Sequence, residues 1–360
     1  MTAPATPGLV RIPIIDVRDG GLVRHAIEGE ARARALRDEC INWLPRPASA
    51  LMPLIDSATR RWLKRSQSPY TAEIEAIVVK LDLVGIWFLN GCYQWGCTTL
   101  AREQAGVPWL ARILDWPFPG LGRHLTVARL KGMAGEFDAV TWSGYLGTLT
   151  GSAPGRFAAC INQAPMWRRT RRPWLRPYDM ALNALAARRV HHIPPDHLLR
   201  YVFETCKTFA EAKRRLETTP VARPVIYTLV GCRPGERCVI ERTEENYSSR
   251  DHDTGAANDW LRSQSPWEAR VRAEVLLTRS FEEAAANSRR RREHLAAWTG
   301  TFAHGGFEWV EPPILNSQTR VAVELCPALG VLRAVGYEQV AGKEFPEPVT
   351  QICELAAAAA

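Results

Sequence analysis

The sequence has no apolar run close to the about 18 to 20 residues that a membrane-spanning helix needs. The longest apolar stretch, around residues 84–89, ends at Asn90. The N-terminus also lacks the basic region and following apolar segment that are typical of a secretory signal. These absences predict a soluble, cytoplasmic protein.

The nine cysteines lack the pattern of a disulfide framework or a metal site. Their number is odd, their spacing is irregular, and no pair has CxxC spacing. Cys92 and Cys97 are five residues apart, which fits neither a zinc nor a redox motif. We therefore expect reduced thiols, no bound metal and no cofactor.

Positive charge dominates, with a formal net charge of +8, and much of it lies in two arginine clusters. The clusters occupy residues 168–172 and 289–292. Such clusters can attract an anionic partner, for example a membrane surface in a transient contact, or they can be solvated loop and helix faces. We favour the solvated faces. Because no nucleic-acid-binding motif accompanies the clusters, we expect no nucleic acid partner.

Apolar spacing predicts helices before Cys97 and strands after it. Helical periodicity covers residues 24–44 and 50–64, and a third helix follows Ser68-Pro69 and extends nearly to Cys97. Short apolar or alternating segments then alternate with Gly and Pro turns, as strands do. These segments are residues 97–102, 109–115, 125–130, 138–150 and 156–162.

The rest of the chain continues with both element types. Residues 197–217 carry a capping box at Thr208 and Glu211, and Ser280 with Glu283 starts another helix. A hairpin is predicted from residues 225–230 and 238–242, and the last strands near residues 320–325 and 331–337. Strands enclosed by helices predict an α+β fold with two sheets layered between helices.

Cys97 stands where helices give way to strands, and Arg112 and Asp115 follow in the next predicted strand. A turn at residues 104–108 makes the two strands antiparallel neighbours, which brings all three side chains together. A cation near a thiol lowers the pKa of that thiol and favours the nucleophilic thiolate. The same pattern also fits a buried cysteine beside an ordinary Arg–Asp ion pair.

Gly96 precedes the cysteine and suggests how a nucleophile with its own base could form. Attack of Cys97 on the Gly96 carbonyl would cut the chain and free the α-amino group of Cys97. Such an amine has a pKa of about 7.7 to 8.0, so it can act as a base at neutral pH. Glycine suits a strained scissile bond because it tolerates unusual backbone conformations. Asp115 would hydrogen-bond and orient the amine.

Several motifs follow one another along the chain: residues 96–99 (GCTT), 112–116 (RILDW), 141–151 (TWSGYLGTLTG), 230–242 (VGCRPGERCVIER), 257–260 (ANDW) and 266–270 (PWEAR). In this order they resemble the acid ceramidase and N-acylethanolamine acid amidase family of cysteine N-terminal-nucleophile (Ntn) hydrolases. The resemblance implies an αββα four-layer sandwich that matures by self-cleavage. Residues 1–96 would form a mostly helical small subunit and residues 97–360 the catalytic large subunit.

The resemblance also implies roles for site residues. Cys97 would be the nucleophile, with its freed amine as the base, while Arg112 would lie against the thiolate and Asp115 would hold the amine. Asn258 would supply an oxyanion-hole donor, and Arg270 would brace it. Asn246 is the rival for that donor role. Gln163 stands where the family has a glutamate, so no acid or base is expected there.

We therefore predict a hydrolase of linear amides that acts through a thioester on a small-molecule N-acyl amide with an apolar, lipid-like acyl group. We expect a neutral rather than an acidic pH optimum. Trp87, Trp95 and Trp116 could line the acyl pocket. One alternative is an acyltransferase that uses the same Cys97 acyl-enzyme. Another is a non-catalytic lipid- or RNA-binding protein on the same scaffold.

Overall fold

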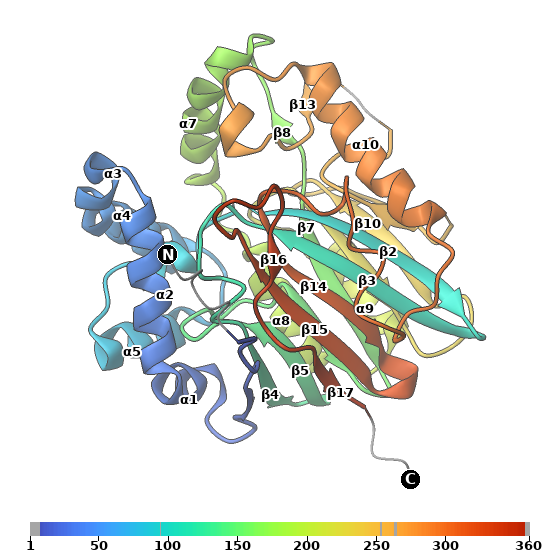
Figure 1. The fold of residues 1–360 in the computed structure, drawn as a ribbon. Coiled ribbons are helices and arrows are strands. Elements are labelled where there is room, and N and C mark those ends of the chain that lie inside the picture. Colours follow the sequence, from blue (N-terminus) through green and yellow to red (C-terminus); the bar gives the residue numbers. More distant parts are fainter. Residues whose placement is uncertain (1–7, 94, 253, 263–264, 357–360) are drawn as a thin grey trace, which may run out of the picture.

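A computed structural model describes residues 8–93, 95–252, 254–262 and 265–356. Two β-sheets lie face to face, and helices cover both outer sides (Figure 1). In spatial order the larger sheet contains β1 (Ile14–Asp16), β4 (Thr126–Gly132), β5 (Gly135–Thr141), β6 (Thr150–Ala153), β7 (Phe157–Gln163), β9 (Val225–Val230), β10 (Arg237–Arg242) and β11 (Tyr247–Arg250). The smaller sheet contains β12 (Gly255–Ala256), β2 (Gly96–Gln104), β3 (Val107–Asp115), β14 (Thr319–Cys326), β15 (Val331–Glu338), β16 (Glu347–Pro348) and β17 (Cys353–Leu355).

Helices α8 (Pro195–Thr205) and α9 (Phe209–Thr218) pack on the larger sheet, and α10 (Phe281–Ala297) packs on β2 and β12 of the smaller one. The apolar face of α8 supplies Phe203, whose ring stacks on Phe137 and Phe157 at centroid distances of 5.3 and 5.0 Å. The predicted caps at Thr208 and Ser280 are present. The predicted α+β arrangement of helix, sheet, sheet and helix layers is therefore confirmed.

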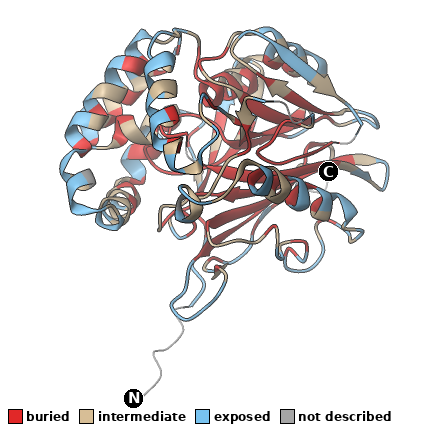
Figure 2. Cartoon of the chain, turned by 90° about the horizontal axis from the view of Figure 1, so that it is seen from above, coloured by how far each residue is buried: buried red, intermediate tan, exposed pale blue. Residues whose placement is uncertain are grey.

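The N-terminal helices lie at one side of the sandwich, on the left in Figure 1. They are α1 (Gly21–Glu28), α2 (Glu30–Trp43), α3 (Arg46–Ala50), α4 (Met52–Arg65), α5 (Thr71–Leu81) and α6 (Ile86–Leu89). Residues 8–93 and the rest of the chain share one hydrophobic cluster, and β1 pairs with β4 in the larger sheet. Figure 2 shows that the strands are mostly buried, whereas the helices expose their outer faces. No helix within the described ranges combines the length and apolarity needed to cross a bilayer.

Two predicted elements extend too far. The third helix ends at Leu81, because Asp82 adopts a left-handed conformation with φ 48°, and a separate turn of helix, α6, follows Gly85. The predicted strand over residues 138–150 is two strands, since β5 ends at Thr141 and β6 begins at Thr150. Between them the chain turns through Gly144, whose φ of 93° favours glycine.

The prediction that both arginine clusters are solvated is wrong for three of their members. Arg168, Arg291 and Arg292 are 2%, 5% and 8% exposed. Arg168 pairs with Asp179 and Glu268, and Arg292 pairs with Asp259. Buried guanidinium groups need such partners, since an unpaired buried charge is costly. The remaining arginines of the clusters, at positions 169, 171, 172, 289 and 290, are exposed.

Candidate active site

The β2–β3 hairpin brings the predicted residues together. The two strands are antiparallel neighbours in which Thr99 pairs with Arg112 and Gly96 pairs with Asp115. Arg112 is buried, and its Nη2 lies 3.2 Å from Cys97 Sγ. The same nitrogen donates to the carbonyl of Ile161 on β7 at 3.0 Å. Arg112 therefore lies against the sulfur, at the place where the two sheets meet.

The Cys97 thiol is fully buried and donates to the Ile161 carbonyl at 3.4 Å. Burial raises the pKa of this thiol, and the Arg112 guanidinium opposes that rise only in part. The thiol therefore keeps its proton at neutral pH, and a base would have to remove it before the sulfur could act as a nucleophile.

The backbone nitrogen of Cys97 is held by Asn258. This N–H donates to Asn258 Oδ1 at 2.9 Å, and Arg291 Nη2 donates to the same oxygen at 3.1 Å. On its other side, Asn258 Nδ2 donates to the carbonyl of Gln163 at 2.8 Å. Two donors on one side and an acceptor on the other fix the orientation of the Asn258 amide.

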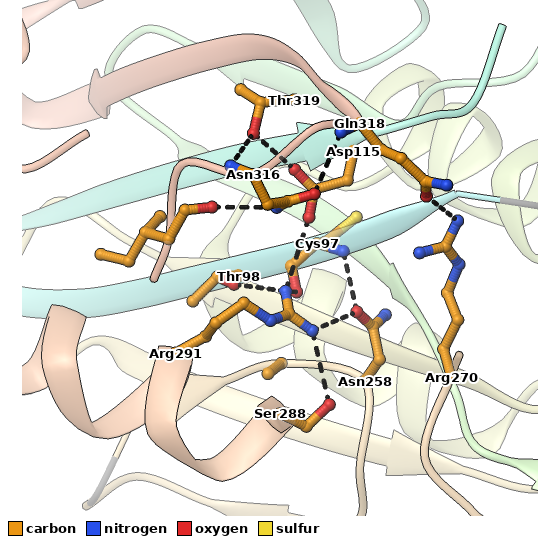
Figure 3. Close-up of polar contacts among 12 residues, drawn as sticks. Cys97, Thr98, Asp115, Asn258, Arg270, Ser288, Arg291, Asn316, Gln318 and Thr319 are labelled. Atoms are coloured by element: carbon orange, nitrogen blue, oxygen red, sulfur yellow. Dashed lines mark hydrogen bonds and ion pairs between the residues drawn. The ribbon is translucent and has the colours of Figure 1, made fainter. Parts of the chain in front are cut away.

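Arg291 is the site residue that the sequence analysis missed. It reaches the site from α10 and donates to the Cys97 carbonyl at 3.0 Å and to Thr98 Oγ1 at 2.7 Å (Figure 3). It also lies 3.5 Å from the Asp115 carboxylate. The buried face of α10 consists of Ala284, Ser288, Arg291, Arg292 and Leu295. The spacing of these residues is helical, so periodicity alone could have placed Arg291 on the buried face. Because arginine is charged, the sequence analysis expected this position to be solvated.

Asp115 lies opposite Gly96 on the neighbouring strand, and its predicted role toward a freed amine stays a prediction. Its Oδ1 accepts a hydrogen bond from Thr319 Oγ1 at 3.0 Å, and its Oδ2 faces Arg291. The contact to the Cys97 nitrogen comes from Asn258 (Figure 3). The reason is the strand register, because Asp115 pairs with Gly96 rather than with Cys97.

Arg270 comes later in the chain than Asn258 but lies beside it, because the backbone nitrogen of Arg270 donates to the Asn258 carbonyl. Its guanidinium donates to Gln318 Oε1 at 3.0 Å and also lies next to Gly96. Gly96 is the first residue of β2 and does not have a positive φ, unlike the strained glycine that the sequence analysis expected. A β-carbon here would stand 2.5 Å from Arg270 Nη1, so a larger residue would displace the Arg270 guanidinium.

A cavity of about 400 Å³ adjoins this site. Near Cys97 its wall is formed by Trp95, Ile161, Gln163 and Arg270. The opposite wall comes from α7 (Arg176–Ala187) and from the two-stranded sheet of β8 (Met166–Trp167) and β13 (Trp267–Glu268). Of the three tryptophans proposed for an acyl pocket, Trp95 lines this cavity. Trp116 lines a separate apolar cavity of about 60 Å³, and Trp87 is buried.

Asn246, the rival of Asn258, is exposed in the turn between β10 and β11. It lies outside the group around Cys97. In the described part of the chain, no three His, Cys, Asp or Glu side chains are grouped as metal ligands would be.

No family model matches the chain. Among curated proteins, N-acylethanolamine-hydrolyzing acid amidase of Oryctolagus cuniculus is 28% identical over 241 residues, which is 65% of this chain and 61% of that protein. The same amidase of Cavia porcellus is 28% identical over 66% of this chain and 62% of that protein. Acid ceramidase of Bos taurus is 31% identical over 54% of this chain and 53% of that protein.

One solved structure that is similar to this chain is a Caenorhabditis elegans ortholog of the amidase, with 17% identity and a TM-score of 0.46 over 65% of this chain and 93% of that one. The match to the amidases from rabbit and guinea pig spans less than two thirds of their length. The resemblance predicted from the motifs is nevertheless confirmed: this chain is a sequence relative of N-acylethanolamine-hydrolyzing acid amidases and acid ceramidases.

Proposed function

We propose that this chain is a self-cleaving cysteine amidohydrolase that acts on linear N-acyl amides. The observation that carries the proposal is the environment of Cys97, whose sulfur contacts Arg112 and whose nitrogen contacts Asn258. A cation beside the sulfur favours a thiolate nucleophile. An amide oxygen bonded to the nitrogen orients the amine that would act as the adjoining base. The curated relatives support amide hydrolysis as the reaction.

Maturation would start with attack of Cys97 Sγ on the Gly96 carbonyl. The Gly96–Cys97 peptide bond breaks, a thioester joins Gly96 to Sγ, and the proton of the thiol ends on the nitrogen of Cys97, which becomes a free amine. Water then hydrolyses the thioester, which leaves a carboxylate at Gly96 and restores the thiol. Residues 1–96 and 97–360 would stay associated, because their apolar side chains share one cluster.

Substrate hydrolysis would repeat this chemistry on an external amide. The freed amine takes the proton of the thiol, Sγ attacks the amide carbonyl, and the leaving amine receives that proton. The acyl group stays on sulfur until water releases it as a carboxylate. Asn258 Nδ2 would stabilise the negative oxygen of the tetrahedral intermediate. Gln163 lines the cavity with a neutral side chain, so no proton transfer is assigned to it.

The acyl group is proposed to be apolar, since α7 contributes Met180, Ala184 and Ala187 to the cavity wall. We further predict that such a substrate is delivered from an anionic membrane surface, which the exposed arginines of the two clusters would attract. Product analysis with an added amine distinguishes hydrolysis from acyl transfer.

The test of the proposed function is the intact mass and the N-terminal sequence of the purified protein beside Cys97→Ala. We expect the wild type to yield a fragment that begins at Cys97, whereas the variant stays whole and hydrolyses no amide. A wild-type chain that remains uncut and inactive under all conditions would contradict the proposal and favour a binding protein.

Arg291 should set the pH dependence of the mature enzyme. The charged groups and thiols that interact with the Cys97 side chain are Arg112, Asp115, Arg270 and Cys160, and Arg291 contacts the Cys97 carbonyl and faces Asp115. Arg291 and this nitrogen bond to the same Asn258 oxygen, so the guanidinium disfavours the ammonium form. Arg291→Gln removes that charge, so the pKa of the amine should rise and the acidic limb of kcat/KM should move up by roughly one pH unit.

Arg291→Lys is the matched variant, because it keeps the positive charge and loses the fixed geometry of the guanidinium. Its acidic limb should stay near that of the wild type, measured on chains whose cleavage has been verified by mass. Equal displacement of the limb in both variants would show that the charge of Arg291 is not the cause.

A further inference from the structure

The charged side chains that line the cavity differ in how well neighbouring groups compensate their charge. In the described part of the chain, five charged side chains line it: Arg176, Glu268, Arg270, Arg223 and Glu244. Arg176 forms a two-pronged ion pair with Glu268, with bonds of 2.6 and 3.0 Å. Arg270 binds Gln318 and is close to Asp115. Arg223 differs from both.

Arg223 lies against two aromatic rings instead of a carboxylate. Its guanidinium carbon is 4.9 Å from the ring centre of Tyr93 and 5.3 Å from that of Trp62. Its Nε is buried and has no hydrogen-bond partner among the described residues. Within those residues, no carboxylate lies inside the 4.0 Å of an ion pair with it. Asp196 and Glu244, which also lines the cavity, attract the guanidinium from farther away.

Such an environment is costly for a cation. Burial lowers the pKa of Arg223, because the guanidinium has lost part of its water. Arg223 is only partly buried, so water can still reach the rest of its guanidinium, but the aromatic faces return only part of the hydration that the cation has given up. A ligand anion would supply both the counter-charge and the missing acceptor for Nε.

The position of Arg223 relative to Cys97 follows from the strand register. Cys97 Sγ contacts the carbonyl of Ile161, and two residues farther along β7 Gln163 pairs with Val225 of β9. Val225 therefore lies about 7 Å beyond Ile161 along the strands, at 3.3 Å per residue, and Arg223 precedes it by two residues, in a bend just before β9. The ring of Tyr93 connects Arg223 with the site, because it lies 4.9 Å from the Arg223 guanidinium carbon and 4.9 Å from the ring of Trp95, which lines the cavity near Cys97.

We propose that Arg223 binds an anionic group of the substrate, so that the preferred amides carry a carboxylate, sulfonate or phosphate several atoms from the scissile bond. This inference rests on the proposed amide hydrolysis and gives its substrate class. Trp62 belongs to α4, so the segment before Cys97 helps to build the anion site. Retention of that segment after cleavage would then matter for specificity.

The experiment measures kcat/KM for dodecanoyl amides of glycine, 4-aminobutanoate and 6-aminohexanoate, each beside its methyl ester. For at least one spacer length, the mature wild type should prefer the free carboxylate over its ester by about tenfold or more. Arg223→Gln should lose about tenfold to a hundredfold on that carboxylate and less than about threefold on the ester. The control is Arg214→Gln, an exposed arginine of α9, which should leave both rates unchanged.

Two results would overturn the inference while amide hydrolysis stands. One is a wild type that cleaves every ester as well as its carboxylate. The other is a loss of equal size on both substrates in Arg223→Gln, which would mean that Arg223 only links α4 to the cavity wall. If the wild type cleaves no amide, the proposed function fails. Calorimetric binding of the 6-aminohexanoate amide to wild type and Arg223→Gln then decides whether the anion site exists, and equal affinities would exclude it.

Discussion

Asn258→Asp is expected to lower kcat for amide hydrolysis about 10²- to 10³-fold, the usual loss when one oxyanion-hole donor is removed. The substitution keeps an oxygen that can accept from the Cys97 nitrogen and from Arg291, as Asn258 Oδ1 does. It removes Nδ2, the group proposed to meet the developing negative charge. Rates should be measured per cleaved chain, because self-cleavage passes through the same kind of intermediate.

Asn258→Ala removes both the acceptor Oδ1 and the donor Nδ2. Comparison with Asn258→Asp, which keeps an acceptor oxygen, separates the contributions of these two groups. We expect the alanine variant to be cleaved more slowly than the aspartate variant, since the Cys97 nitrogen loses its acceptor. Asn246→Ala is the matched control, because that asparagine is exposed in a turn and should leave kcat unchanged. Full activity of Asn258→Asp would remove the oxyanion role from Asn258.

Glu268→Ala is expected to lower the free energy of unfolding by about 3 to 5 kcal/mol, the cost of breaking a buried ion pair from one side. Glu268 accepts from Arg168 and from Arg176, and all three side chains are at most 1% exposed. Without it, Arg168 would keep Asp179 at 2.6 Å, but Arg176 would lose the carboxylate that holds it. The result would be an uncompensated buried charge between α7 and β13.

Urea unfolding of these variants is best measured in the Cys97→Ala background, where the chain is expected to stay in one piece. Glu344→Ala provides the control, because Glu344 is exposed and should change the unfolding free energy by less than about 0.5 kcal/mol. A loss below about 1 kcal/mol in Glu268→Ala would mean that the two arginines find other acceptors.

The sequence by itself determined the elements that carry the site. Residues 97–102 and 109–115 are short, largely apolar segments that flank a turn, and a local pattern of this kind predicts an antiparallel hairpin without help from the rest of the chain. Arg112 therefore had to return beside Cys97. The motif order similarly distinguished Asn258 from Asn246, which the structure separates into a buried and an exposed position.

Only the tertiary structure decided which charges are buried and what they contact. Arg291 lies in a run of four arginines that resembles a solvated helix face, yet α10 turns this residue toward β2, where Cys97 and Asn258 bind it. Arg168 is likewise paired internally, with Asp179, a partner in α7, and with Glu268, 100 residues away. Local sequence encodes helical and strand periodicity, but the partner that makes a buried charge stable comes from a distant segment, and only folding brings it within reach.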